Sequence, residues 1–107
     1  KMPYLVTTSI YPSEQVQEVG ARYLEALAKY PPDESLTTQV VPAAVTTTQQ
    51  GIKVIGISDV IEGKLEEALR RAGDFMVMFH SIAGFEYTIR VYSKVEEAMS
   101  AIGMDMP

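Results

Sequence analysis

His80 is the residue of this chain best suited to acid–base chemistry. It is the single histidine, and it lies in the apolar segment FMVMFHSI, where burial would tune an imidazole that titrates near neutral pH. A proton shuttle is therefore one interpretation. The other is structural, because a histidine near the end of a helix also caps backbone carbonyls or forms a hydrogen bond at an interface. A lone histidine favours the structural interpretation.

A second set of candidates comes from the alternating segment FEYTIRVYS. Four polar residues fall on one face of the expected strand: Glu86, Thr88, Arg90 and Tyr92. An arginine binds a carboxylate or phosphate through two parallel hydrogen bonds, and a tyrosine donates to a carbonyl or stacks on a ring. The pattern predicts a site for a small anionic or aromatic ligand. An ion pair of Glu86 with Arg90 across a dimer interface explains the same residues.

The segment YLVTTSIY, residues 4–11, supplies the remaining candidates. One face of this strand is the more apolar and is expected to meet the helices: Tyr4, Val6, Thr8 and Ile10. Thr7, Ser9 and Tyr11 then join the polar set of the last strand. A lining of hydroxyl groups with few charges fits an organic molecule better than a metal or a nucleotide. Solvated threonines in an antiparallel sheet are the alternative.

Composition excludes several classes of function. The 107 residues carry a formal charge of −5, and the nine Lys and Arg residues are scattered, which disfavours binding to nucleic acid. The chain has no cysteine and one histidine, so disulfides, thiolate chemistry and a multi-histidine zinc centre within one copy are excluded. The glycines are dispersed and form no phosphate-binding loop. No metal or cofactor is expected.

Length and hydropathy predict one soluble domain that associates with itself. A hydrophobic content of 47% is high for a small monomer, and a second copy would cover the surplus. No apolar run reaches the roughly 20 residues of a membrane span, and no signal sequence is present, so a cytoplasmic location is expected. Lys1 before Met2 is interpreted as an addition, which leaves a single domain of residues 2–107.

The first half of the chain predicts a strand, a helix and a hairpin. Pro12 and Ser13 end the first strand and begin a helix, whose apolar stripe runs at helical spacing until the prolines at 31 and 32. Residues 36–48 predict an edge strand bent near Pro42. Residues 52–61 are apolar on both faces, with Ile55 and Ile57 opposite Ile52 and Val54, which indicates a central strand.

The second half predicts a helix, a strand and a short terminal helix. Helical spacing runs from Leu65 to Ala83, but residues 75–81 also fit a strand if the helix ends at Gly73. After Gly84, residues 85–93 form the clearest strand. Residues after Ser93 predict a short helix that Gly103 ends.

The order strand, helix, strand, strand, helix, strand is that of the ferredoxin-like α+β sandwich, with two helices on one face of a four-stranded antiparallel sheet. The chain resembles the dimeric α/β-barrel superfamily, chiefly through Gly84-Phe85-Glu86-Tyr87 at the start of the last strand and Glu96-Glu97-Ala98 in the terminal helix. The resemblance implies that two open sheet faces meet in a barrel. The superfamily includes cofactor-free monooxygenases, isomerases and haem enzymes, and the resemblance assigns no catalytic residue in this chain.

Three functions are compatible with these patterns. The first is a homo-oligomeric binding or structural protein that holds a small organic or anionic ligand near Arg90 and Tyr92. The second is a cofactor-independent isomerase or monooxygenase, in which His80 moves a proton and Arg90 or Tyr92 stabilises negative charge. The third is an adaptor that binds another protein through Val77 and Met78. The sequence favours the first.

Overall fold

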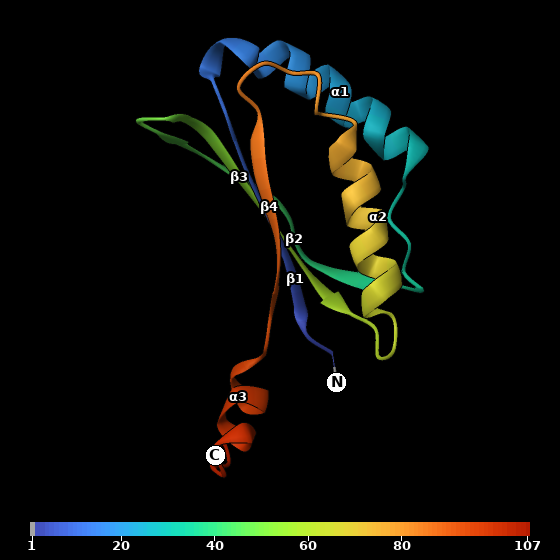
Figure 1. Ribbon diagram of the computed structural model, residues 1–107, viewed down its shortest axis with the longest axis vertical. Helices are drawn as coiled ribbons and strands as arrows, with labels where there is room; N and C mark the ends of the chain where they lie inside the picture. Colours follow the sequence, from blue (N-terminus) through green and yellow to red (C-terminus); the bar gives the residue numbers. More distant parts are fainter. Residues whose placement is uncertain (1) are drawn as a thin grey trace.

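The computed structural model describes residues 2–107 (Figure 1). Lys1 lies outside the described residues, and so does the interpretation placed on it. The helices and strands follow the predicted order, with one short 3₁₀ helix added before the first α-helix. They are β1 (Tyr4–Tyr11), η1 (Ser13–Gln15), α1 (Val16–Lys29), β2 (Thr37–Thr48), β3 (Gly51–Val60), α2 (Leu65–Val77), β4 (Glu86–Tyr92) and α3 (Val95–Ala101).

The four strands form one antiparallel sheet in the order β2-β3-β1-β4. β1 and β3 are central, and β2 and β4 are the edges. α1 and α2 lie on the same side of the sheet (Figure 1). This arrangement confirms the α+β class, and the order of elements and strands agrees with the ferredoxin-like sandwich.

Two clusters of buried side chains fill the space between the sheet and the helices. The larger one joins β1, α1, α2 and the turn after α2: Tyr11, Val19, Ala26, Met76, Phe79 and Ile82. The smaller one is formed by Leu5, Val60 and Ala68. Leu24, an apolar residue of α1, is 68% exposed, because it lies about 140° around the helix axis from the buried Val19.

The prediction for the two faces of β1 is wrong. Leu5 and Tyr11 are buried in the core, so the odd-numbered residues of β1 point toward the helices. Thr7 and Ser9 therefore also face the helices. The more apolar set faces away from them: Tyr4, Val6, Thr8 and Ile10.

Strand register is the reason for this reversal. Each face of β1 carries both apolar and hydroxyl side chains, so alternation alone does not choose between them. Residues directly opposite each other on neighbouring strands share a face. Val6 lies opposite Arg90, whereas Thr7 lies opposite Ile89, which packs on the core. The position of β4 thus decides which way β1 faces.

α2 ends at Val77, which settles the ambiguous segment. The helical interpretation holds as far as Val77, and residues 78–84 form turns, not a strand. The N–H of Met78 donates to the carbonyl of Phe75 at 3.3 Å, a tightened last turn. Gly84 has a φ of +78°, and a Cβ there would lie 2.6 Å from Cγ of Pro12. This turn therefore requires glycine.

β2 is the bent edge strand that the sequence predicts. Its register with β3 shifts between Gln39 and Val41, and again between Val41 and Ala44. Pro42 has no N–H to donate to the ladder, which explains the irregularity. No residue of 37–48 belongs to either core cluster.

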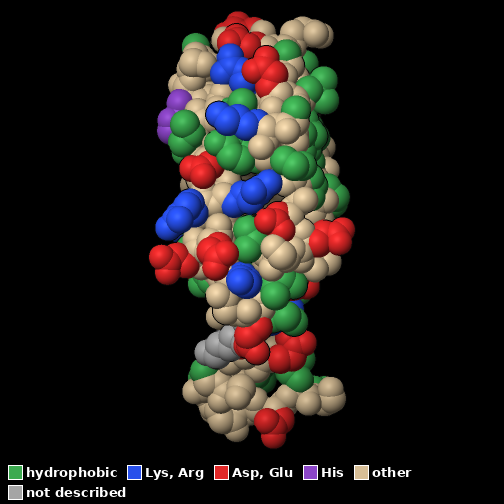
Figure 2. All heavy atoms as spheres, turned by 90° about the vertical axis from the view of Figure 1, so that its right-hand side faces the viewer, with side chains coloured by type: hydrophobic (Ala, Val, Ile, Leu, Met, Phe, Trp, Pro, Cys, Tyr) green, Lys and Arg blue, Asp and Glu red, His purple; other side chains and the backbone are tan. Residues whose placement is uncertain are grey.

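α3 lies beyond the end of the sheet (Figure 1), and none of its residues is buried. An ion pair between Lys94 Nζ and Asp59 Oδ1, 2.6 Å apart, holds its first turn against β3. Figure 2 shows the terminal segment as a lobe below a narrower neck. The radius of gyration is 15.4 Å, against about 13 Å for a compact chain of this length. The chain therefore has an extended shape.

Candidate functional site

The sheet face opposite the helices is open to solvent in a single chain. Its centre is apolar, because two pairs of opposed residues lie side by side on β1 and β3: Val6 with Ile57, and Thr8 with Ile55. The prediction for β3 is confirmed, since Ile52 and Val54 pack on the core and the two isoleucines point the other way. A face of this kind needs a cover.

The four polar residues of β4 lie together on this open face. Register places Glu86 opposite Ile10 and Arg90 opposite Val6, with Thr88 and Tyr92 on the same side. The Tyr92 side chain is 52% exposed. Together they form a polar margin along the β4 edge of the apolar centre, and a binding role for them stays a prediction.

Charges of opposite sign lie near opposite ends of this face. Lys53 is on β3 and Glu86 on β4, both level with Ile10 at the end of β1. Asp59 is on β3 at the other end, where Lys94 pairs with it, and Arg90 lies nearby on β4. β3 and β4 therefore each carry one acidic and one basic residue on the open face.

The chain exposes more surface than a compact monomer of its mass. Its accessible area is 7065 Å², whereas a monomer of this mass exposes about 5,900 Å². The difference, roughly 1,100 Å², exceeds the area of about 800 Å² that each partner buries in a standard protein interface. Part of the surplus comes from α3 and the residues after it, where Val95 and Ile102 are exposed apolar residues.

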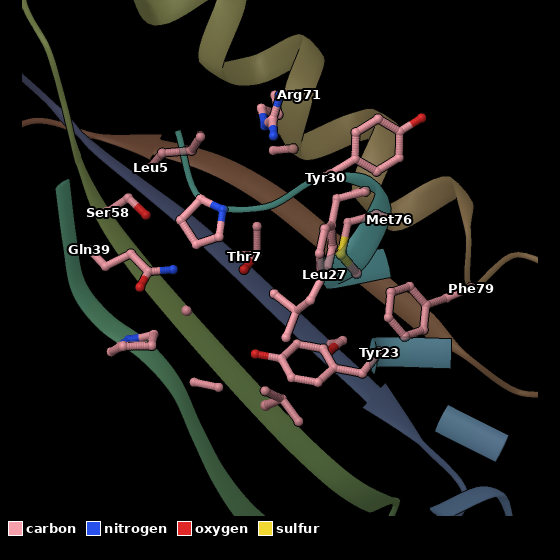
Figure 3. Close-up of a pocket in the computed structure, with 18 of the residues that line it drawn as sticks. Leu5, Thr7, Tyr23, Leu27, Tyr30, Gln39, Ser58, Arg71, Met76 and Phe79 are labelled. Carbon is pink, nitrogen blue, oxygen red and sulfur yellow. The ribbon is translucent and has the colours of Figure 1, made fainter. Parts of the chain in front are cut away.

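A cavity of about 470 Å³ lies on the other side of the sheet, beneath α1 and α2. It extends from the centre of the sheet to β2 and to the loop after α1, where the helices leave the sheet uncovered. Figure 3 shows Leu5, Thr7, Gln39 and Ser58 reaching into it from the strands, opposite side chains of the helices.

The sheet side of the cavity carries polar groups among apolar side chains such as Leu5 and Val54. Thr7 and Ser9 come from β1, Ser58 from β3 and Gln39 from β2. Within residues 2–107 none of these four side chains donates or accepts a hydrogen bond to another protein group. Their hydrogen-bonding capacity is therefore available to whatever fills the cavity.

Gly56 widens this polar side. It lies opposite Thr7 in the ladder, and a Cβ on it would be 3.0 Å from Thr7 Oγ1 and 3.3 Å from the carbonyl oxygen of Pro42. Any larger residue would fill the space between the Thr7 hydroxyl and the bulged part of β2. The absent side chain and the bulge together shape the cavity.

The helix side of the cavity is apolar and rich in rings. Tyr23, Leu27 and Met76 point into it in Figure 3, with Phe79 beside them. The Tyr23 and Phe75 rings meet edge to face at 6.1 Å between centroids. The cavity therefore has one hydrogen-bonding wall and one aromatic wall.

Charges occur only at the rim, among the residues that line the cavity: Asp33 and Arg71. Ser35 donates to the Asp33 carboxylate from its hydroxyl at 2.6 Å and its N–H at 3.0 Å, and these bonds hold the pKa of Asp33 below its ordinary value. Arg71 donates to the Pro31 carbonyl and lies over the Tyr30 ring. Both charged groups already have protein partners.

Tyr11 lines the inner end of the cavity and keeps its proton. Burial raises the pKa of the Tyr11 hydroxyl, so it remains a neutral donor across the ordinary pH range. Its ring stacks on Phe85 at 5.8 Å between centroids. Tyr11 thus adds a further uncharged polar group to an apolar surround.

His80 lies outside this cavity. It follows α2 in the turn region, and its Nε2 is 2.7 Å from the Tyr87 hydroxyl, with the two rings stacked at 5.6 Å. It shares a separate hollow at the β4 edge with Glu86 and Thr88. The side chain is exposed, and His80 is not among the residues that line the cavity.

The residues predicted to bind a ligand therefore separate into two places, with His80 apart from the cavity at the β4 edge. Glu86, Thr88, Arg90 and Tyr92 share the open face, whereas Ser9 and Tyr11 face the cavity beneath the helices. Sequence reasoning missed Gln39, Gly56 and Ser58. The signal that could have found them is a glycine and a serine at alternate positions on the helix-facing side of β3, where packing normally requires bulk.

No helix within residues 2–107 is long and apolar enough to cross a membrane. No protein-family model matches the chain, and no curated protein matches it.

Two solved structures are similar in fold. One is the de novo designed protein Foldit4, with 13% identity, 87% of this chain and 97% of that chain covered, and a TM-score of 0.48. The other is the C-terminal domain of the MgtC protein from Mycobacterium tuberculosis, with 10% identity, 89% and 94% coverage, and a TM-score of 0.46. The order and pairing of the strands, and not these likenesses, establish the chain as an α+β domain with a four-stranded antiparallel sheet.

Proposed function

We propose that this chain is a self-associating domain in which a second copy covers the open sheet face. The observation that carries the proposal is an apolar centre on β1 and β3 flanked by charges that complement themselves. The surplus of accessible surface over that of a compact monomer supports it as well.

The complementarity follows from the strand register. Thr7 lies opposite both Gly56 and Ile89, at the middle of the sheet. A two-fold axis that crosses the strands at this level, between two face-to-face sheets, reverses each strand against its counterpart. Lys53 then meets Asp59 of the second copy.

The same axis also reverses β4 against β4 of the second copy. It brings Glu86 of one copy to the end of the second copy's β4 that carries Arg90 and Tyr92. The apolar centre meets itself, with Ile55 against Ile57 of the second copy. Exposed ion pairs contribute only about 0.2–1 kcal/mol each. The charges therefore fix the orientation, and the apolar centre supplies the affinity.

Charge reversal on β4 tests this arrangement. The chain is expected to elute as a dimer in size-exclusion chromatography with light scattering. Arg90→Glu places an acidic group one position along the same face from Glu86 of the second copy, which lies opposite Tyr92, and should shift the equilibrium toward monomer. Adding Glu86→Arg to Arg90→Glu exchanges the two charges and should restore the dimer.

Arg70→Glu is the matched control, because Arg70 is exposed on α2, away from the sheet face. It makes the same change in net charge and should leave the dimer intact. A wild-type monomer at high concentration would contradict the proposal. So would an equal loss of dimer in the Arg70 and Arg90 variants.

A small anionic molecule held between the copies near Arg90 and Tyr92 remains a prediction. Native mass spectrometry of the untagged dimer tests it, since a retained ligand adds mass that Arg90→Gln should remove. Catalysis by His80 is not proposed, because the exposed imidazole lies outside the cavity beneath the helices and is hydrogen-bonded to the Tyr87 hydroxyl.

A further inference from the structure

The cavity beneath the helices is separate from the open face, because the sheet lies between them. Its volume of about 470 Å³ is within the range of about 300–1,000 Å³ typical of small-molecule sites. It also lies where the predicted core of a two-layer sandwich would be filled by large apolar side chains. The side chains that occupy those positions must therefore be explained.

Polar and small residues take the place of core residues on the central strands. At the middle of the sheet, Thr7 and Gly56 face the helices as neighbours. The next helix-facing residues along the two strands, in opposite directions, are Ser9 on β1 and Ser58 on β3. Hydroxyl groups in this layer lose apolar contact and gain no protein hydrogen bond. They are suited to a ligand that accepts or donates hydrogen bonds.

The opposite wall limits the shape of such a ligand. Tyr23, Leu27 and Met76 face the hydroxyls across the cavity (Figure 3). Aromatic and thioether groups favour flat, polarizable partners. A ring compound with its oxygen atoms toward β1 and β3 matches both walls.

The charged residues that line the cavity indicate whether its ligand is ionised. Asp33 and Arg71, at the rim, are the charged residues among those that line the cavity, and both are held by protein groups. A charged ligand would lose its hydration in the interior and find no counter-charge there. An uncharged ligand avoids that penalty.

We propose that the cavity between the sheet and α1 and α2 is a binding site for an uncharged ring compound that carries hydroxyl or carbonyl groups. The hydroxyls of Thr7 and Ser58 bind its oxygen atoms, and the rings of α1 and α2 cover its face. The site is complete within one copy of the chain.

The test uses 2-naphthol as the probe and naphthalene-2-sulfonate as its charged counterpart. Side-chain methyl spectra by NMR report which face of the sheet is occupied. Titration with 2-naphthol should shift the methyl signals of Leu27, Ala72 and Met76, which line the cavity. The signals of Ile55 and Val6, on the open face, should stay in place. Naphthalene-2-sulfonate should bind at least tenfold more weakly.

Thr7→Val and Thr8→Val form a matched pair. Both remove one hydroxyl from the same strand, but Thr7 faces the cavity and Thr8 the open face. Thr7→Val should weaken binding of 2-naphthol about fivefold, as expected for one neutral hydrogen bond, and Thr8→Val should leave it unchanged. Ala72→Leu, which narrows the cavity from α2, should weaken both the binding and the methyl shifts without relying on the hydroxyls.

Three outcomes would overturn the proposal: no methyl shift at millimolar 2-naphthol, shifts confined to Val6 and Ile55, or equal binding of the sulfonate. If Thr7→Val bound 2-naphthol with unchanged affinity, the hydroxyls would have no role in binding, and the assignment of a ligand with hydroxyl or carbonyl groups would be wrong. The Arg90→Glu variant should bind 2-naphthol like the wild type even as a monomer. Failure of the dimer is therefore distinguishable from failure of this site.

Discussion

Replacing Thr7 by valine should stabilise the protein even though it weakens ligand binding. The substitution exchanges a hydroxyl for a methyl group of similar size, and both residues are β-branched with a high preference for strands. Thr7 is half-buried and faces α1 and α2, and its hydroxyl makes no hydrogen bond to another described residue. A folded chain would ordinarily place an apolar side chain there.

The expected gain follows from burial. A fully buried methylene contributes about 0.8 kcal/mol, and removing a poorly compensated hydroxyl from an apolar layer adds about 1–3 kcal/mol at full burial. Because the side chain is only half-buried and the cavity admits water, the free energy of unfolding should rise by roughly 0.5–1 kcal/mol. That corresponds to an increase in Tm of about 3–6 °C for a domain of this size.

Guanidinium denaturation followed by circular dichroism measures this change, at fixed protein concentration because a dimer makes the midpoint depend on concentration. Thr8→Val, on the open face, is the control and should change the free energy by less than about 0.3 kcal/mol. Destabilisation by Thr7→Val, or an equal gain in stability from Thr8→Val, would refute the claim that the Thr7 hydroxyl faces the cavity without a protein hydrogen-bond partner.

Three further predictions concern the glycines, the core and pH. Gly84→Ala should cost about 1–3 kcal/mol in thermal unfolding, because φ is +78° and Pro12 occupies the space of the Cβ. Gly73→Ala in α2, with open space around it, should instead stabilise the protein by about 0.5–1 kcal/mol. A change of the same sign in both variants would contradict these environments. Val60→Ala should cost about 2 kcal/mol in denaturant unfolding, since Val60 is fully buried, and a cost below about 0.5 kcal/mol would disprove its burial. The pKa of Asp33, measured by carbon NMR, should lie below its ordinary value and rise in Ser35→Ala, because hydrogen bonds from Ser35 favour the ionised form. The contribution of these hydrogen bonds to folding stability is present above the ordinary pKa and is lost as the pH falls through the lowered pKa.

The sequence by itself determined the order and type of the elements. Alternation in β1 and β4, helical spacing in α1, and the breaks at Pro12 and Gly84 are local signals, because backbone sterics and side-chain period act within a few residues. The bend of β2 at Pro42 is of the same kind, since a residue without an N–H belongs at an irregular edge.

Only tertiary structure decided which face of β1 the helices cover. Both faces mix apolar and hydroxyl residues, so the choice depends on pairing with β4, far along the chain, where Thr7 lies opposite Ile89. The end of α2 at Val77 was also undecided, because the apolar residues that follow suit a helix, a strand or a buried turn.

The cavity is likewise a product of the assembled fold. It needs Gly56 beside Thr7 and the bulge of β2 at Pro42, features that are distant in sequence and meet only when the sheet pairs. Local propensity fixes what each segment becomes, whereas register and packing between distant segments fix which side chains share a space. For this protein the first determined an α+β domain, and the second decided where its polar residues point.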